Sequence, residues 1–293
     1  MKTLRQYIRE AQEKKTAIGH FNISDSVGLW AVFNAARKMN LPVIIGVSEG
    51  ERDFIGVRQA AALVKSLREQ YDFPIFINAD HTYSFERVKE AIDAGFDMVI
   101  FDGTELAFDA NVRVTKQCVD YAKSSKPFWG ERVLVEAELG YIGKSSKVLD
   151  SVPEGINLSD EYLTTAEQAK RFVQETRVDM LAPAVGNIHG MLAKGKDPAL
   201  NISRVADIAQ ATGVPLVLHG ASGNTDADIQ NAIKAGVAIV HVNTELRVAY
   251  RTTLDSTLLA DPKQVAPYKY LAPSRDAVAQ VVEEKMKAFS FLG

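Results

Sequence analysis

Eight short apolar runs that alternate with longer helical patterns constrain the fold of this chain more than any other feature of its sequence. Most of these runs are apolar throughout, without the alternation of a strand that faces water. Uniformly apolar runs are typical of parallel strands that are covered on both faces. We therefore expect buried strands at Ala17–Ile23, Val43–Val47, Ile75–Ala79, Met98–Phe101, Val133–Ala137, Asp179–Ala182, Leu216–Leu218 and Val237–Val242.

Helical signals fill the segments between these runs. Asp25–Met39 and Phe54–Leu67 each place their apolar residues on one face of a helix. Thr164 and Glu167 have the spacing of a capping box, which predicts that a helix begins there. Two further helices are expected, one from Thr225 to the stop at Ala235-Gly236 and a last one at Ser274–Phe289.

Eight strand-helix units in one chain favour an α/β fold, a single (β/α)8 TIM barrel that spans residues 1–293. An open, doubly wound sheet is the alternative. Its Gly-x-Gly-x-x-Gly fingerprint is absent after the first run, where Gly19-His20-Phe21 stands instead. The segment from about 259 to 293 exceeds what a barrel requires, and we interpret it as a C-terminal helical extension that serves as a cap or an oligomer contact.

Composition narrows the class of partner. Lys and Arg number 34 against 37 Asp and Glu, and a net charge of -3 argues against a nucleic acid or a membrane surface as partner. Cys118 is the only cysteine, so no internal disulfide is possible and a reducing compartment is indicated. No signal peptide or membrane-length apolar run is recognisable, and we expect a cytoplasmic protein whose Cys118 is buried.

Polar side chains stand where most of the predicted strands end. Because the carboxyl ends of barrel strands converge on one face, we expect a site there. Three histidines without a nearby cysteine match the ligand count of an open catalytic zinc site, whereas His20 lies inside the first strand and is interpreted as structural. The polar strand-end residues are Asn22, Ser48, Asp80, His81, Asp102, Glu138, His189, His219, Asn243 and Thr244.

The acidic residues of this set leave alternatives open. Asp80 adjoins a predicted ligand, so it is either an anchor for that ligand or a carrier of protons. Asp102 and Glu138 hold a second or mobile cation, or else serve as helix caps or salt-bridge residues. The glycine-rich turns at Gly190 and Gly220, with Ser222, Asn243 and Thr244, suit phosphate binding, although tight turns also use glycine.

Taken together, these motifs resemble the class II, metal-dependent ketose-bisphosphate aldolases over nearly the whole chain. The matching motifs are Phe21-Asn22-Ile23, Gly46-Val47-Ser48-Glu49-Gly50, Asp80-His81, Ala94-Gly95-Phe96-Asp97, Phe101-Asp102-Gly103, Val135-Glu136-Ala137-Glu138-Leu139-Gly140, Gly186-Asn187-Ile188-His189-Gly190, Leu216-Val217-Leu218-His219-Gly220-Ala221-Ser222-Gly223 and Tyr270-Leu271-Ala272-Pro273-Ser274-Arg275.

The resemblance implies a TIM barrel that reversibly cleaves a phosphorylated ketose, fructose 1,6-bisphosphate or a close relative, into dihydroxyacetone phosphate and an aldehyde. It implies that His81, His189 and His219 hold Zn²⁺, and that Asp80 moves the proton at the aldehyde oxygen. It implies that Asp102 and Glu138 form an alternative position for the metal or a site for a second or monovalent cation. It implies that the phosphate is bound by Gly190, Gly220, Ser222, Asn243 and Thr244. It implies that other substrate contacts come from Asn22 and Ser48. It also implies a homodimer or homotetramer.

Several residues depart from the family pattern. After Glu138-Leu139-Gly140 the family carries an acid on a mobile loop that moves the proton of the ketose carbon, but here Gly143-Lys144-Ser145-Ser146-Lys147 follows. Asp150 or Glu154 is a candidate replacement within the polar stretch 140–162, which we interpret as a lid. Residues near the substrate also differ, with Thr82, Ala221, Ile239 and His241 where the family usually has glycine, glycine, lysine and asparagine.

These departures keep rival functions open. The same metal barrel would serve a different phosphorylated ketose, or a barrel that has lost catalysis would serve as a binding or regulatory protein. A metal-dependent hydrolase is a third alternative. Aldolases that form a Schiff base need a lysine in the barrel, whereas Lys144, Lys194 and Lys196 fall in polar loops.

Overall fold

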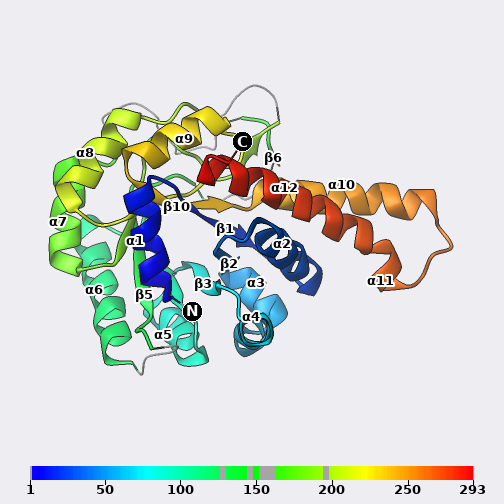
Figure 1. Cartoon of the computed structure of the whole chain (residues 1–293). Coiled ribbons are helices and arrows are strands. Elements are labelled where there is room, and N and C mark those ends of the chain that lie inside the picture. Colours follow the sequence, from blue (N-terminus) through cyan, green and yellow to red (C-terminus); the bar gives the residue numbers. More distant parts are fainter. Residues whose placement is uncertain (1, 126–129, 144–147, 152–162, 194–197, 293) are drawn as a thin grey trace.

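The structure, a computed structural model, describes residues 2–125, 130–143, 148–151, 163–193 and 198–292. In these residues eight parallel strands close into a barrel in the order β1-β10-β9-β7-β5-β4-β3-β2 (Figure 1). The TIM barrel predicted from the sequence is therefore confirmed, and the open doubly wound sheet is excluded. The strands are β1 (Ile18–Asn22), β2 (Val43–Val47), β3 (Ile75–Thr82), β4 (Met98–Phe101), β5 (Leu134–Leu139), β7 (Met180–Pro183), β9 (Leu216–Leu218) and β10 (Val237–Val242).

Helices surround the barrel and follow its strands. They are α1 (Leu4–Lys14), α2 (Ser26–Met39), α3 (Glu49–Ile55), α4 (Val57–Tyr71), α5 (Phe85–Ala94), α6 (Phe108–Ser124), α7 (Ala166–Thr176), α8 (Ile202–Thr212), α9 (Asp226–Ala235), α10 (Thr244–Ala260), α11 (Pro267–Tyr270) and α12 (Ala272–Ser290). Thr225 caps α9 through a bond from the Asp228 N–H at 3.2 Å, as the sequence predicts.

Two apolar layers separate the inside of the barrel from its outside. The outward residues of the strands pack against the helices, and this layer includes the buried Cys118, whose pKa burial raises to about 12. The inward residues of the amino-terminal half of the barrel, among them Ile44, Phe76 and Met180, pack under Leu4 and Ile8 of α1. The apolar plug leaves only the carboxyl-terminal half of the interior for polar groups.

The predicted helix Phe54–Leu67 is confirmed as α4 from Val57 onward, but its start is wrong, because Phe54 and Ile55 belong to the separate helix α3. Gly56 separates α3 from α4 with φ +94°, a conformation that glycine adopts without strain. The predicted capping box is displaced by one residue: Thr165 caps α7 with Gln168, while the Thr164 hydroxyl donates to the Leu139 carbonyl oxygen at 2.6 Å. Thr164 thus ties the chain before α7 to the end of β5.

The polar stretch 140–162 contains a short strand that the sequence did not predict. Within it β6 (Val148–Leu149) pairs in parallel with β8 (Met191–Leu192). This small sheet joins the loop after β5 to the loop after β7. Residues 144–147 and 152–162, which carry most of the predicted lid, lie outside the described residues.

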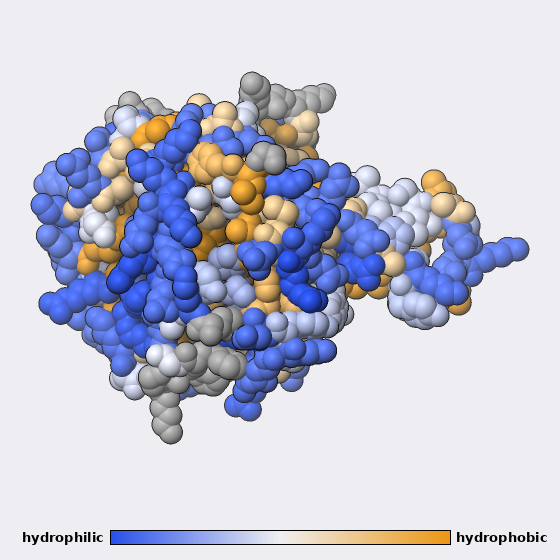
Figure 2. Space-filling model, in the orientation of Figure 1, coloured by the Kyte–Doolittle hydropathy of each residue, from blue (hydrophilic) through white to orange (hydrophobic). Residues whose placement is uncertain are grey.

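The C-terminal extension has two parts. The later part of α12 packs against α2, α9 and β1, with Val278, Val282 and Phe289 buried, so it belongs to the outer helical layer. The earlier part runs beside α10 and projects from the barrel with α11 at its end (Figure 1). Figure 2 shows hydrophobic residues at the tip of this projection, where Leu259 and Val265 are more than 80% exposed. Among the described residues, no helix is both long and apolar enough to cross a membrane.

Candidate active site

A bulge in β3 turns two successive side chains toward the same site. Asn78 and Asp80 point into the barrel, so regular alternation would direct His81 outward. The pairing of β3 with β4 shifts register between Ala79 and Thr82, and His81 has φ +37°. Positive φ is strained for a residue with a side chain, and a bulge redirects such a residue. Asp80 and His81 therefore both face the carboxyl end of the barrel.

Arg52 supports this bulge from inside α3. Its guanidinium is almost fully buried and donates to the carbonyl oxygens of Val47 at 2.6 Å and Asp80 at 3.0 Å. It also donates to the Thr82 hydroxyl at 3.0 Å. A helix predicted to begin at Phe54 leaves Arg52 out, so the role of Arg52 was not predicted. The arginine stabilises a backbone shape that apolar periodicity does not reveal.

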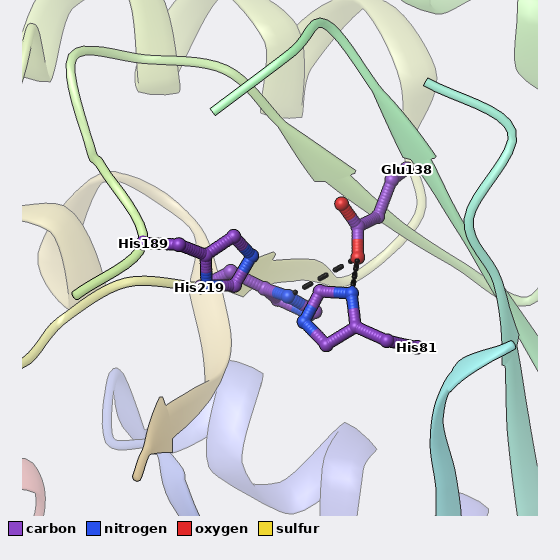
Figure 3. Close-up of side chains that lie close together, drawn as sticks. All are labelled: His81, Glu138, His189 and His219. Atoms are coloured by element: carbon purple, nitrogen blue, oxygen red, sulfur yellow. Dashed lines mark ion pairs between the residues drawn. The ribbon is translucent and has the colours of Figure 1, made fainter. Parts of the chain in front are cut away.

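Three imidazoles and one carboxylate converge at the mouth of the barrel, as Figure 3 shows. One ligand atom from each of His81, Glu138, His189 and His219 lies within 4.8 Å of the others. Glu138 Oε1 lies 2.9 Å from His81 Nδ1 and 3.3 Å from His219 Nδ1. Ligands around a tetrahedral zinc ion are about 3.3 Å apart, so this cluster is close to the dimensions of a metal site.

The backbone positions of these residues differ from the strand-end prediction. Glu138 lies within β5, because that strand extends to Leu139, and His219 directly follows β9. His189 is not at a strand end, since β7 stops at Pro183. It lies on the loop to β8, held by a bond from its N–H to the Ile142 carbonyl oxygen at 2.9 Å. The strand-end rule was wrong for His189 although the residue reaches the cluster.

The cluster fits a cation. Glu138 Oε1, His189 Nε2 and His219 Nδ1 are buried without a well-formed hydrogen bond among the described residues. Burial lowers the pKa of His189 and His219, which keeps both imidazoles neutral and able to ligate. Burial lowers the pKa of His81 too, but Glu138 and Asp80 overcome that effect and raise it well above its usual value. Positive charge is thus favoured at this point.

Glu136 orients one of the imidazoles. Its Oε1 lies 2.8 Å from His219 Nε2, and burial raises the pKa of Glu136 well above the usual range. The contact leaves His219 Nδ1 to face Glu138. A carboxyl group behind a histidine ligand fixes the ring and its tautomer in metal sites. No sequence pattern assigns Glu136 this role, although it lies two residues before Glu138 and so points to the same side of β5.

Asp102 lies behind His81. Its Oδ2 is 3.2 Å from His81 Nδ1, and its Oδ1 accepts hydrogen bonds from the Thr104 hydroxyl and N–H. Burial opposes its charge, but His81 and Thr104 hold the pKa of Asp102 at about 2. Asp102 thus contacts the cluster through one histidine, a geometry that suits an anchor as well as an alternative ligand.

Asp80 has its own set of partners. Its Oδ2 accepts from Asn22 Nδ2 at 2.8 Å, and its Oδ1 lies 3.4 Å from His241 Nδ1. Burial would raise the pKa of Asp80, yet the charge of His81 and the contact with His241 keep it well below the usual value. The carboxylate is therefore ionised and able to accept a proton.

His241, which departs from the family's asparagine, stands in a column of imidazoles. Its ring stacks on His20 with centroids 3.5 Å apart and on His219 with centroids 4.0 Å apart. Asn78 Nδ2 lies 3.0 Å from His20 Nε2, which supports the structural interpretation of His20. A Cβ on Gly46 would lie 2.1 Å from the His20 ring, so only glycine leaves room for it.

The predicted phosphate residues lie beside the cluster. A narrow cavity adjoins the cluster, and the predicted phosphate residues form part of its lining. Its lining residues are Asn22, Asp80, His81, His189, Gly190, His219, Gly220, Ser222, His241, Asn243 and Thr244. Gly220 has φ +62°, and a Cβ there would lie 2.1 Å from the Ile188 carbonyl oxygen. Thr244 begins α10, whose amino end attracts negative charge. Ser48 lies outside this lining, where its N–H donates to Glu51 at 2.8 Å.

Two polar residues near Asn22 were not anticipated. Glu51 Oε2 accepts from Asn22 Nδ2 at 2.9 Å, and its Oε1 lies 2.6 Å from the Arg247 guanidinium. The capping-box spacing from Ser48 to Glu51 was visible in the sequence, but nothing in the pattern links Glu51 to Arg247. Among the other loop predictions, Asp150 is described and carries no active-site contact, while Glu154, Lys144, Lys194 and Lys196 lie outside the described residues.

Comparisons with known proteins agree with this geometry. The family model described as "Fructose-bisphosphate aldolase class-II" matches residues 2–293. A fructose-bisphosphate aldolase of Geobacillus stearothermophilus is 37% identical over 99% of this chain and 97% of its own length. One from Staphylococcus aureus (strain N315) is 37% identical over 98% of this chain and 96% of its own length.

A solved structure extends the agreement to three dimensions. The crystal structure of the YdjI aldolase from Escherichia coli K12 superimposes with a TM-score of 0.81 at 31% identity, and the match covers 98% of this chain and 96% of that one. Sequence and fold thus agree from end to end. The chain belongs to the class II fructose-bisphosphate aldolase family, whose members are metal-dependent lyases that act on phosphorylated sugars.

Proposed function

We propose that this protein is a zinc-dependent aldolase that reversibly cleaves a phosphorylated ketose, fructose 1,6-bisphosphate or a close relative, into dihydroxyacetone phosphate and an aldehyde. The observation that carries the proposal is the bulge that turns Asp80 and His81 together toward His189, His219 and Glu138. A proton acceptor and a set of nitrogen ligands then share one cavity, and His189 and His219 among them are neutral. His81, His189 and His219 hold the ion, with Glu138 or Asp102 as an alternative or additional ligand.

The chain's own residues move the proton and orient the groups that react. A bound zinc ion would supply a Lewis acid for the negative charge that builds on the ketose half. Asp80 takes the proton of the hydroxyl group that becomes the aldehyde, and it returns that proton during condensation. Asn22 and His241 orient the Asp80 carboxylate through its two oxygens. Both contacts favour the ionised form that the step requires.

The phosphate of the ketose half occupies the glycine-rich side of the cavity. Gly190, Gly220 and Ser222 supply backbone and hydroxyl donors there, and Asn243 and Thr244 add the amino end of α10. This position places the phosphate on the same side of the metal cluster as the ends of β9 and β10. The phosphate thereby aligns the carbon–carbon bond between the metal ligands and Asp80.

Assembly and location stay predictions. We expect a homodimer or homotetramer, and the exposed Leu259, Val265 and Tyr268 at the end of the projecting helices support an apolar contact between subunits. We also expect zinc rather than another divalent ion, and a cytoplasmic protein. Light scattering of the purified protein will measure the mass of the assembly.

Proton exchange in dihydroxyacetone phosphate tests the proposal without reference to the aldehyde. In D₂O the zinc-loaded protein should replace one hydrogen at the carbon that forms the new bond, and nuclear magnetic resonance will follow the loss of that signal. Cleavage of fructose 1,6-bisphosphate is measured in parallel by trapping dihydroxyacetone phosphate. Exchange without cleavage of this ester would shift the assignment to another ketose. Absence of both would contradict an aldolase and favour a binding or regulatory barrel.

A further inference from the structure

A second cavity adjoins the proposed catalytic site on the side of Asn22. It measures about 240 Å³, and its polar lining residues are Asn22, Ser24, Asp25, Glu51, Asn243, Arg247 and Tyr250. Asn22 and Asn243 also line the narrow cavity around the metal cluster, so the two spaces share one wall. Nothing in the proposed reaction of the ketose half uses this space.

The position of the cavity assigns it to the other half of the substrate. This step depends on the proposed function, in which Asp80 acts on the hydroxyl group beside the broken bond. Asn22 Nδ2 bridges Asp80 Oδ2 at 2.8 Å and Glu51 Oε2 at 2.9 Å. The path from the metal ligands past Asp80 and Asn22 therefore leads to Glu51, where the aldehyde half of the ketose lies.

Negative charge dominates the described lining of this cavity. Asp25 and Glu51 contribute two carboxylates, and Arg247 is the one cationic side chain in the described lining. Arg247 already pairs with Glu51 at 2.6 Å, and the Glu51 side chain is only 6% exposed. Glu51 Oε2 also accepts from the Ser48 N–H at 2.8 Å, so neighbouring groups hold the carboxylate in place.

A phosphate at this position would meet an unfavourable environment. A dianion that binds Arg247 would stand beside the buried Glu51 carboxylate, and like charges brought together at an interface are strongly disfavoured. Hydroxyl groups meet the opposite situation, because Glu51 and Asp25 accept hydrogen bonds while Arg247 and Asn22 donate them. Tyr250 already donates to Asp25 at 2.9 Å, which shows that this carboxylate accepts a hydroxyl group.

We propose that the preferred substrate is a ketose 1-phosphate whose far end is an unphosphorylated, hydroxyl-rich chain, and that Glu51 selects against a second phosphate. The juxtaposition of Glu51, Asp25 and Arg247 in a cavity beyond Asp80 distinguishes this enzyme from one built for a bisphosphate. Glu51 acts on the far end of the substrate and takes no part in breaking the carbon–carbon bond.

Condensation with matched aldehydes tests the proposal. Dihydroxyacetone phosphate loses a proton from its carbon, that carbon bonds to the aldehyde carbon, and the aldehyde oxygen gains a proton. The zinc-loaded protein is given D-glyceraldehyde or D-glyceraldehyde 3-phosphate, and D-erythrose or D-erythrose 4-phosphate. We expect kcat/KM for the unphosphorylated member of at least one pair to be higher by about tenfold or more.

Glu51→Gln sharpens the test, because glutamine keeps an oxygen that accepts from Asn22 while it removes the charge. The preference should shift by about tenfold or more toward the phosphorylated aldehyde. Asp53→Asn is the matched control, since it removes a carboxylate from the same helix at an exposed position, and the preference should not change. Proton exchange in dihydroxyacetone phosphate is measured in the same two variants, because a loss of exchange in Glu51→Gln would reveal general damage rather than a change of selection.

Each other outcome overturns the inference. Three results would overturn the inference and leave the proposed aldolase reaction standing. They are equal rates within both pairs, a preference for the phosphorylated members, and no condensation with any aldehyde while exchange proceeds. Absence of exchange as well would overturn the aldolase assignment itself. An unchanged preference in Glu51→Gln would remove Glu51 as the selecting residue.

Discussion

The two ends of the barrel bury carboxylates in opposite ways. At the amino-terminal end the Asp97 carboxylate forms an ion pair with the Arg68 guanidinium. The Asp179 carboxylate pairs with Arg132 at 2.6 Å and with Arg5 at 2.9 Å. At the carboxyl-terminal end Asp80, Glu136 and Glu138 are buried more completely, but their ion-pair partners in the described chain are imidazoles. Asp80, Glu136 and Glu138 each keep an oxygen without a well-formed hydrogen bond among the described residues.

This difference separates stability from function. A buried carboxylate with a complete set of donors stabilises the fold, and removal of one partner leaves a costly unpaired charge. A buried carboxylate that faces only imidazoles, which are neutral or shared with other carboxylates, lacks a full positive partner. Such a carboxylate instead needs a bound ligand to satisfy its charge. Substitutions at the carboxyl-terminal end should therefore reduce activity, and those at the amino-terminal end should reduce stability.

Removal of a histidine at the metal cluster should have the largest effect on activity. His219→Ala deletes an imidazole whose Nδ1 faces Glu138 at 3.3 Å. We expect the rate of cleavage to fall roughly 1000-fold or more, because a Lewis acid supplies several kcal/mol to such reactions. Metal content, measured by atomic absorption, should fall with the rate. Full metal content in an inactive variant would show that His219 is not a ligand.

Asp80→Asn should reduce kcat by roughly 100-fold to 1000-fold, the range expected when a positioned proton carrier is lost. The amide retains an oxygen for Asn22 Nδ2, so the local geometry is kept. Metal content should stay at the wild-type value, which distinguishes this residue from the histidines. A variant with near-normal kcat would break the assignment of Asp80 as the proton carrier.

Glu136→Gln should weaken zinc binding by roughly 10-fold to 100-fold, because Glu136 orients the His219 ring from behind. Competition with a chromophoric chelator measures the affinity. The rate at saturating zinc should recover most of its wild-type value. If zinc affinity is unchanged while the rate is lost, Glu136 acts on the substrate side and not on the ligand.

Asp179→Asn should lower the free energy of unfolding by roughly 2–3 kcal/mol, since Arg132 and Arg5 lose a charged partner that is only 6% exposed. Activity per folded molecule should not change. Urea unfolding measures the first quantity and initial rates the second. Asp255→Asn is the matched control, because its pair with Arg251 is exposed and the free energy of unfolding should not change measurably.

The pH dependence of this effect has a definite sign. Burial opposes the charge of Asp179, but Arg132 and the Val135 N–H lower its pKa in the folded state. A group with a depressed folded pKa contributes stability above its unfolded pKa, about 3.9, and loses it as the pH falls through the folded pKa. The difference between wild type and Asp179→Asn should stay constant from pH 7 to about pH 5 and narrow below about pH 4. A constant difference at lower pH would contradict the lowered pKa.

The sequence predicted the barrel and most of the cluster because both depend on short-range signals. Continuous apolar runs identified the strands, and Asp80-His81 and His219 stand beside such runs. The bulge at His81 was not predictable from periodicity, since it depends on a positive φ and on Arg52 from another element. The Glu51–Arg247 pair joins residues 196 positions apart, and only the closed barrel brings them together.

The most direct test of the account is cleavage of a ketose 1-phosphate by protein that has been stripped of metal with a chelator and then dialysed. We predict that dihydroxyacetone phosphate is released only after zinc is added back, and that His219→Ala does not respond to the same addition. Release by the stripped protein at the rate of the zinc-loaded protein would contradict the account, because the unpaired groups at the carboxyl end of the barrel would then need no cation.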